Sequence, residues 1–261
     1  MYEFDVIRPA TISEAVEALA DEDAQALGGG QTLIPTLKAR LASPSALVSL
    51  SKVAEMIGIC YDDQGRLCIG AATTHAAVAR DTSYPALSAM AAHIGDPAVR
   101  NRGTIGGSLA NNDPAACYPA GVLASNATIT TNKREIAADD FFQGLFETAL
   151  EEGEIVTEVK FTIPQAANYQ KFIQPASRFA LVGVFVAKFA DGVRVAVTGA
   201  SEEGVHRWTA AEEALSSEFT PEAIADLTVL SDTLISDAHA IADYRSHLVK
   251  VMTGRAVKAA G

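Results

Sequence analysis

Two glycine-rich loops constrain the fold of this 261-residue chain more than any other feature of its sequence. The first reads Gly-Gly-Gly-Gln-Thr at 28–32, and the second reads Thr-Ile-Gly-Gly-Ser at 104–108. Consecutive glycines let backbone N–H groups converge on an anion, because no Cβ holds a phosphate away from the chain. The two loops together predict a ligand with two phosphates, held from both sides.

The spacing of these glycines does not match the common nucleotide-binding motifs. The first loop is not G-x-x-x-x-G-K-[ST], so a nucleoside triphosphate site is not indicated. It is not G-x-G-x-x-G either, because the sixth position counted from Gly28 is Leu33. A glycine triplet is also a frequent turn, and Gly106 and Gly107 would equally permit tight backbone packing. By spacing alone, phosphate binding and structural turns remain equally open.

The residues around both loops carry a family resemblance. The segments concerned are 4–11, 28–35, 69–75, 96–116 and 179–184. Taken together and in this order, they resemble the medium, FAD-binding subunit of the molybdenum hydroxylases. That family includes carbon monoxide dehydrogenase and bacterial xanthine dehydrogenase.

The resemblance implies a fold and a division of the chain. The expected fold class is α+β, with a two-lobed, vanillyl-alcohol-oxidase-like (PCMH-type) FAD-binding domain at 1–164. Its lobes would cover about 1–54 and 55–164, and a small α/β domain would follow at 165–261. Within these domains the apolar patterns predict helices over 11–19, 74–80, 84–94, 221–230 and 237–256. They predict strands over 47–50, 127–131 and 158–164, hairpins about 62–65 and 191–192, and a linker at 165–168.

The resemblance also implies a function. The chain would be the FAD-carrying electron-transfer subunit of a heterotrimeric molybdenum hydroxylase, and so an oxidoreductase subunit. Non-covalent FAD would take electrons from [2Fe–2S] clusters on a small subunit and pass them to an external acceptor. The substrate would be hydroxylated at molybdopterin on a large subunit, in a dimer of heterotrimers. A stand-alone flavin oxidase of the same fold, and a non-catalytic assembly subunit that has lost FAD, are the alternatives.

Site residues carry over from the family one at a time. Gly28 to Leu33 would cradle the pyrophosphate, and Thr104 to Ser108 match the second phosphate-side loop. Ile94 and Val156 correspond to apolar FAD contacts, and Phe179 stands where some relatives place a tyrosine over the flavin ring. For Ile94 and Phe179, a core position is an equally good interpretation. The residues expected at FAD are Gly28, Gly29, Gly30, Gln31, Thr32, Leu33, Ile94, Thr104, Ile105, Gly106, Gly107, Ser108, Cys117, Val156 and Phe179.

One position departs from the family pattern. Where relatives commonly carry an acidic residue that holds the FAD ribose, this chain has Cys117. A thiol is a weak hydrogen-bond partner, so that ribose contact is in doubt. Asn111, Asn112 and Asp113 are candidates to compensate for it. No catalytic base is expected, because the redox chemistry belongs to the cofactor.

Charge and cysteine content bound the partners. A formal net charge of −12 argues against a nucleic-acid partner, which would require a basic face. The three cysteines are too few for one [2Fe–2S] cluster, which takes about four such ligands, and the histidines show no metal-ligand spacing. Cys60 and Cys68 flank a turn and are expected to be small buried hydrophobes. The chain begins without a secretory signal and has no apolar run of the ~20 residues that span a membrane, so we expect a cytoplasmic protein.

Overall fold

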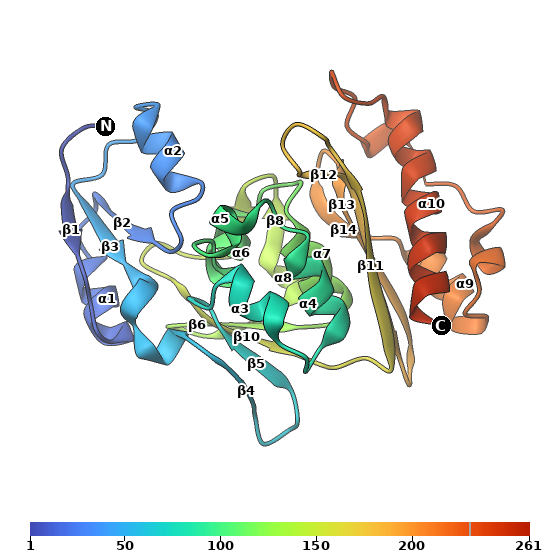
Figure 1. Ribbon diagram of the computed structural model, residues 1–261, viewed down its shortest axis with the longest axis horizontal. Helices are drawn as coiled ribbons and strands as arrows, with labels where there is room; N and C mark the ends of the chain where they lie inside the picture. Colours follow the sequence, from blue (N-terminus) through green and yellow to red (C-terminus); the bar gives the residue numbers. More distant parts are fainter. Residues whose placement is uncertain (230) are drawn as a thin grey trace.

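The N-terminal lobe is a small parallel sheet with two helices. The computed structural model describes residues 1–229 and 231–261, and in it this lobe lies at one end of the molecule (Figure 1). The strand order is β1-β3-β2, and both pairings are parallel. The elements are β1 (Asp5–Ile7), α1 (Ile12–Ala18), β2 (Ala24–Leu27), α2 (Leu33–Lys38) and β3 (Ala46–Ser49). Thr11 caps α1 by accepting a hydrogen bond from the N–H of Glu14 at 3.2 Å, and this confirms the predicted helix start.

The second lobe is built on a five-stranded antiparallel sheet, in the order β4-β5-β10-β6-β7. The 3-10 turns η1 (Leu50–Lys52) and η2 (Ala54–Met56) connect the two lobes. Its strands are β4 (Ile59–Tyr61), β5 (Leu67–Gly70), β6 (Thr128–Thr131), β7 (Glu135–Ala137) and β10 (Val156–Phe161), with the small hairpin β8 (Phe142–Gly144) and β9 (Glu147–Thr148) beside them. Its helices are α3 (His75–Arg80), α4 (Pro85–Ala92), α5 (Pro97–Arg100), α6 (Ile105–Asn111), α7 (Cys117–Ala124) and α8 (Ala138–Phe141).

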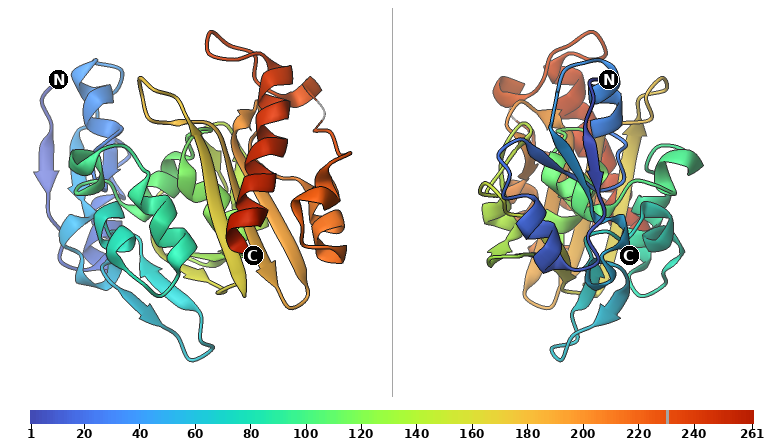
Figure 2. Two further views of the ribbon diagram at one scale, coloured as in Figure 1. Left: turned by 45° about the vertical axis from the view of Figure 1, so that its right-hand side comes forward. Right: turned by 90° about the vertical axis from the view of Figure 1, so that its left-hand side faces the viewer.

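The C-terminal part is a four-stranded antiparallel sheet in the order β11-β12-β13-β14, at the opposite end of the molecule from the N-terminal lobe (Figure 1, Figure 2). Its strands are β11 (Ala166–Ile173), β12 (Ala180–Phe189), β13 (Gly192–Ser201) and β14 (Gly204–Arg207). The helical elements are α9 (Thr209–Ser217), η3 (Pro221–Ile224), η4 (Ser231–Thr233) and α10 (Ala242–Ala260). Helices α9 and α10 cover the outer face of this sheet, and α4 and α7 of the second lobe pack on its inner face.

Burial on both faces explains the long apolar run of β12. Val184 and Val186 belong to the core under α9 and α10, whereas Phe185 and Ala187 belong to the core of the two preceding lobes. A strand buried on both sides reads as a continuous hydrophobic segment rather than an alternating one. The predicted hairpin with its turn at 191–192 is confirmed by the pairing of Phe189 with Gly192.

Three local predictions were wrong. The predicted linker at 165–168 is the start of β11, whose polar residues are accommodated because β11 is an edge strand. The helix predicted over 221–230 is only the 3-10 turn η3, since Ile224 alone of that turn is buried and a short helix needs packing to form. Residue 230 lies outside the described residues. Cys60 is exposed, on the edge strand β4, while its cross-strand partner Cys68 is buried.

The last helix begins later than predicted, at Ala242, and continues to Ala260. Over the ranges 1–229 and 231–261, no helix combines the length and the apolarity that crossing a membrane requires.

Candidate functional site

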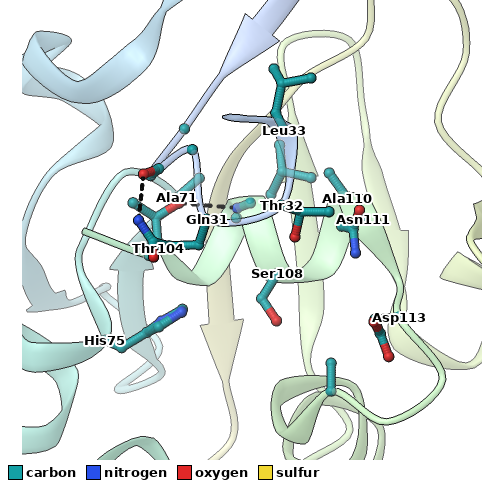
Figure 3. Close-up of a pocket in the computed structure, with 18 of the residues that line it drawn as sticks. Gln31, Thr32, Leu33, Ala71, His75, Thr104, Ser108, Ala110, Asn111 and Asp113 are labelled. Atoms are coloured by element: carbon teal, nitrogen blue, oxygen red, sulfur yellow. Dashed lines mark hydrogen bonds between the residues drawn. The ribbon is translucent and has the colours of Figure 1, made fainter. Parts of the chain in front are cut away.

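A cavity of about 620 Å³ lies between the lobes, and both glycine loops line it. The first loop joins β2 to α2, and the second leads into α6. The C-terminal sheet closes one part of the cavity with residues from β11 and from the loop before β12. The volume falls in the range of about 300–1,000 Å³ that is usual for small-molecule and cofactor sites. Figure 3 shows the polar side chains of Ser108, Asn111 and Asp113 directed toward the same space.

The first loop presents unpaired backbone donors to the cavity. Among the described residues, the N–H groups of Gly29, Gly30, Gln31 and Thr32 have no hydrogen-bond acceptor. Gly30 has a φ of +73°, a left-handed conformation that glycine adopts without strain. Thr32 precedes α2 and makes no side-chain cap. In the first turn of that helix, the N–H of Ile34 donates to the carbonyl of Gly30 at 3.1 Å, and Pro35 has no N–H. Successive free N–H groups of this kind form a concave site for an anion.

The second loop differs, because its N–H groups are already bonded within the protein. The N–H of Gly106 donates to the carbonyl of Ala71 at 2.9 Å, and that of Gly107 donates to Oγ1 of Thr104 at 3.1 Å. The N–H of Ile105 reaches the carbonyl of Thr73 at 3.1 Å. The prediction of free donors therefore holds for the first loop only. Because its glycines have no side chain, the second loop lets a ligand approach its backbone closely. It also contributes the hydroxyl of Ser108, which points into the cavity (Figure 3).

The glycines of the two loops divide into packing and cavity-facing positions. A Cβ on Gly29 would collide with the carbonyl of Arg102, and one on Gly106 would lie 2.5 Å from the Cβ of Ala71. By contrast, the nearest atom to a Cβ on Gly28 or Gly107 would be Oγ1 of Thr104, at 3.1 and 3.0 Å, which is a close contact with a side chain and not a collision with backbone. Tight packing and ligand approach, the two interpretations left open by spacing, thus apply to different residues of the same loops.

The structure brings almost all of the predicted site residues to this cavity. Ile94, Cys117, Val156 and Phe179 come from four separate segments of the chain and line it together with the two loops. Ile105 is the exception, since its side chain is fully buried in the hydrophobic core. Contact of the cavity-lining residues with FAD stays a prediction.

Sequence reasoning assigned no role to several other residues of the cavity wall. They are His75, Glu154, Lys171 and Arg178. His75 lay within a segment that carried the family resemblance, and Thr74 caps the helix that begins at His75. Burial lowers the pKa of His75 to about 4, with a further contribution from the charge of Arg100. The imidazole is therefore neutral at pH 7 and adds no positive charge to the cavity.

Asp113, one of the candidates to compensate for Cys117, lines the cavity together with it. Its carboxylate accepts a hydrogen bond from the N–H of Ala115 at 2.8 Å and is directed into the cavity (Figure 3). Burial raises the pKa of Asp113, and the bond from Ala115 opposes that rise. A partly buried carboxylate beside a cavity is suited to accept hydrogen bonds from hydroxyl groups of a ligand.

Glu154 holds the strand that carries Val156. Burial alone would raise its pKa, but hydrogen bonds from Arg134, from Thr131 at 2.6 Å and from the N–H of Glu151 outweigh burial and bring the pKa to about 2. The carboxylate is therefore ionised at neutral pH and ties the turn after β6 to the start of β10.

These features fit FAD. The free N–H groups of the first loop and the bare backbone of Gly28 and Gly107 suit a pyrophosphate, which needs donors and close approach. The apolar side chains of Ile94, Ile155 and Val156 suit aromatic rings.

Comparison with known proteins agrees with this fit. Residues 2–166 match the family described as the FAD binding domain in molybdopterin dehydrogenase. The chain is 34% identical to the nicotine 6-hydroxylase medium subunit of Paenarthrobacter nicotinovorans, over 97% of this chain and 95% of that protein. It is 31% identical to the carbon monoxide dehydrogenase medium chain of Afipia carboxidovorans, over 98% and 96% of the two chains.

A solved structure extends the likeness to the whole fold. A chain of quinoline 2-oxidoreductase from Pseudomonas putida superimposes with a TM-score of 0.88 at 32% identity, covering 99% of this chain and 97% of the other. The match to the FAD-binding domain family and the sequence identity along the whole chain show a family relationship, which a shared fold alone would not. The chain belongs to the family of FAD-binding medium subunits of the molybdenum hydroxylases.

Proposed function

We propose that this chain holds FAD in the cavity between its lobes and serves as the electron-transfer subunit of a molybdenum hydroxylase. The observation that carries the proposal is the row of free N–H groups at 29–32. They face a second loop in which Gly107 places no side chain between the backbone and the cavity. The family match over residues 2–166 supports FAD as the ligand. Electrons enter from iron–sulfur clusters on a partner and leave to an external acceptor.

The residues of this chain bind and orient the cofactor. FAD, when bound, supplies redox chemistry that amino-acid side chains cannot perform. The amides of the first loop hold its pyrophosphate, and Asp113 accepts hydrogen bonds from its ribose hydroxyls. Ile94 and Val156 exclude water from the rings, and Phe179 stacks at the edge of the cavity.

The proposal includes the partner subunits. The relatives are medium chains or medium subunits, names that belong to assemblies with a small and a large chain. The iron–sulfur clusters lie on the small subunit and molybdopterin on the large one, in a dimer of heterotrimers. The three cysteines of this chain are all free, and this fits a reducing cytoplasm.

We also propose that the chain divides near residue 164. The FAD-binding domain then covers 1–164, and the C-terminal domain covers 165–261. The family match, which ends at residue 166, and the start of β11 at Ala166 support this boundary.

Purification of the native complex through a tag on this chain tests the function. We expect the chain to copurify with a small and a large subunit, with iron and molybdenum in the metal analysis. Acid denaturation should release free FAD, identified by chromatography. Release of FMN, flavin retained on the unfolded chain, or recovery of a lone chain that oxidises an organic substrate would contradict the proposal. The last outcome would favour a stand-alone flavin oxidase.

A further inference from the structure

The C-terminal sheet makes a direct contact with the wall of the cavity. Oγ1 of Thr198, on β13, lies 2.8 Å from the carbonyl oxygen of Pro114 and 2.8 Å from that of Ala116. The N–H of Gly199 donates to the same Pro114 carbonyl at 2.7 Å. Pro114 lies between Asp113 and Ala115, which both line the cavity, and Ala116 lines it too. Thr198 is fully buried and does not itself reach the cavity.

A single hydroxyl proton serves both carbonyls. A threonine hydroxyl donates one hydrogen bond at a time, so Thr198 shares its proton between Pro114 and Ala116. Since Pro114 has a second donor in Gly199, the hydroxyl matters most for the link to Ala116, the residue immediately before α7. This link joins the C-terminal sheet to the start of the helix that carries Cys117.

The position of Thr198 is itself held from the other side of the sheet. Gly199 has a φ of +81°, and a Cβ there would lie 2.5 Å from the carbonyl of Ala180. The side chain of Arg245 on α10, 3% exposed, donates to the carbonyl of Gly199 at 2.7 Å and to that of Leu181 at 2.6 Å. A buried guanidinium with these partners fixes the backbone next to Thr198.

The same strand also holds the far end of α7. Nε of Arg194, on β13, donates to the carbonyl of Leu123 at 3.2 Å, and its guanidinium pairs with Asp139 at 2.7 Å. Helix α7 is therefore aligned by β13 at both ends, and its first residue, Cys117, lies in the cavity wall.

We propose that Thr198 is a positioning residue for the cofactor site. From the C-terminal sheet it sets the path of residues 114–116 and thereby the places of Asp113 and Cys117 in the cavity wall. The inference rests on the proposed FAD-binding function. It makes FAD affinity depend on a hydroxyl that touches neither the cofactor nor the cavity.

The test compares two buried threonines. Thr198→Val removes the hydroxyl with little change of shape, and Thr253→Val is the matched control. Thr253 is equally buried, but its Oγ1 donates to Val249 at 2.7 Å within α10 itself. Thr198→Ser keeps a hydroxyl at position 198. The measurements are the FAD dissociation constant of the full apo chain, by flavin fluorescence, and its unfolding midpoint.

We expect Thr198→Val to raise the dissociation constant about tenfold, the effect of one buried hydrogen bond. Thr198→Ser and Thr253→Val should each change it less than about twofold, although both valine variants lose some stability. Amide hydrogen exchange of residues 113–117 should accelerate in Thr198→Val only. If Thr198→Val does not fold, Thr198→Ala and Thr253→Ala make the same comparison.

Two results would overturn the inference. One is an unchanged FAD affinity in Thr198→Val, and the other is an equal loss in Thr253→Val, which would indicate general destabilisation. A wild-type chain that binds no FAD would instead contradict the proposed function. In that case hydrogen exchange at 113–117 still shows whether Thr198 holds the segment.

Discussion

At the scale of single residues, neighbouring glycines of one loop have different roles. Gly106 lacks a side chain because its backbone lies against Ala71, and Gly29 because it lies against Arg102. A Cβ on Gly28 or Gly107 would lie close to the side chain of Thr104, at 3.1 or 3.0 Å from its Oγ1, and would not collide with backbone. Both glycines line the cavity and leave the approach to it open. A substitution at Gly107 can therefore separate ligand binding from folding.

Gly107→Asp should abolish FAD binding while the chain stays folded. Gly107 lies in the first turn of α6, where a negative side chain is favourable for the helix. The same charge repels a pyrophosphate, by about 4 kcal/mol for two unit charges 4 Å apart near a surface. We expect at least about a hundredfold loss of FAD affinity in titrations, with an unchanged circular dichroism spectrum.

Gly107→Asn separates charge from bulk, because asparagine has nearly the same size. Cys117→Ala should weaken binding much less than Gly107→Asp, since a thiol contributes little as a hydrogen-bond partner. Equal flavin occupancy in folded Gly107→Asp and Cys117→Ala would show that the second loop is not beside the phosphates.

Asp113→Asn should stabilise the apo chain and weaken FAD binding. Burial raises the pKa of Asp113, so the unfolded chain loses this proton at lower pH than the folded chain does. Stability therefore falls as pH rises through that interval, and the ionised group destabilises the fold at pH 7. Removing the charge should raise the free energy of unfolding at pH 7, and the gain should vanish below the ordinary pKa of 3.8.

The FAD dissociation constant of Asp113→Asn should rise about three- to tenfold, because a charge-assisted hydrogen bond becomes a neutral one. Denaturant unfolding across pH 3 to 8 and fluorescence titration measure the two effects. Asp63→Asn, in the exposed turn between β4 and β5, is the control. An Asp113→Asn chain with wild-type affinity would remove Asp113 from the ribose site.

At the scale of elements, one buried carboxylate joins the turn after β6 to the start of β10. Glu154 receives hydrogen bonds from Thr131, Arg134 and the N–H of Glu151. The strand that follows begins at Val156, in the cavity wall. The acid–base state of Glu154 therefore bears on both the sheet and the cavity.

Glu154→Gln should destabilise the chain at neutral pH by about 1.5–3 kcal/mol, the usual value of a hydrogen bond to a charged group. Because the pKa of Glu154 is lowered from 4.5 to about 2, its stabilising effect is complete above 4.5 and is lost as pH falls toward 2. The difference between wild type and Glu154→Gln should shrink over that interval in denaturant unfolding. The exposed Glu152→Gln should match wild type throughout, and a constant difference at every pH would exclude this role for Glu154.

At the scale of the whole molecule, the C-terminal sheet shares a hydrophobic core with the two lobes. Phe185 of β12 and Ala196 of β13 belong to the same buried cluster as Ile105 and Tyr118 of the second lobe. The two carbonyls held by Thr198 extend that contact to the cavity wall. The cavity is therefore formed by both lobes and the C-terminal sheet together.

The sequence by itself determined the fold class, the family and the two glycine loops that line the cavity. Glycine motifs, helix starts and apolar runs are local patterns, so they identify the helix that begins at 11, the hairpin about 191–192 and the loop at 28–33. The family resemblance added Ile94 and Val156, which no periodicity singles out.

Only the tertiary structure decided which backbone donors are free. The amides of 105–108 find acceptors within their own helix turn and on the segment 71–73, which precedes them by about thirty residues, and a sequence does not show such pairings. The same holds for Thr198, whose partners Pro114 and Ala116 lie 84 and 82 residues away. Hydrogen bonds between distant segments depend on packing, because local residue patterns carry no record of which chain segment will lie opposite.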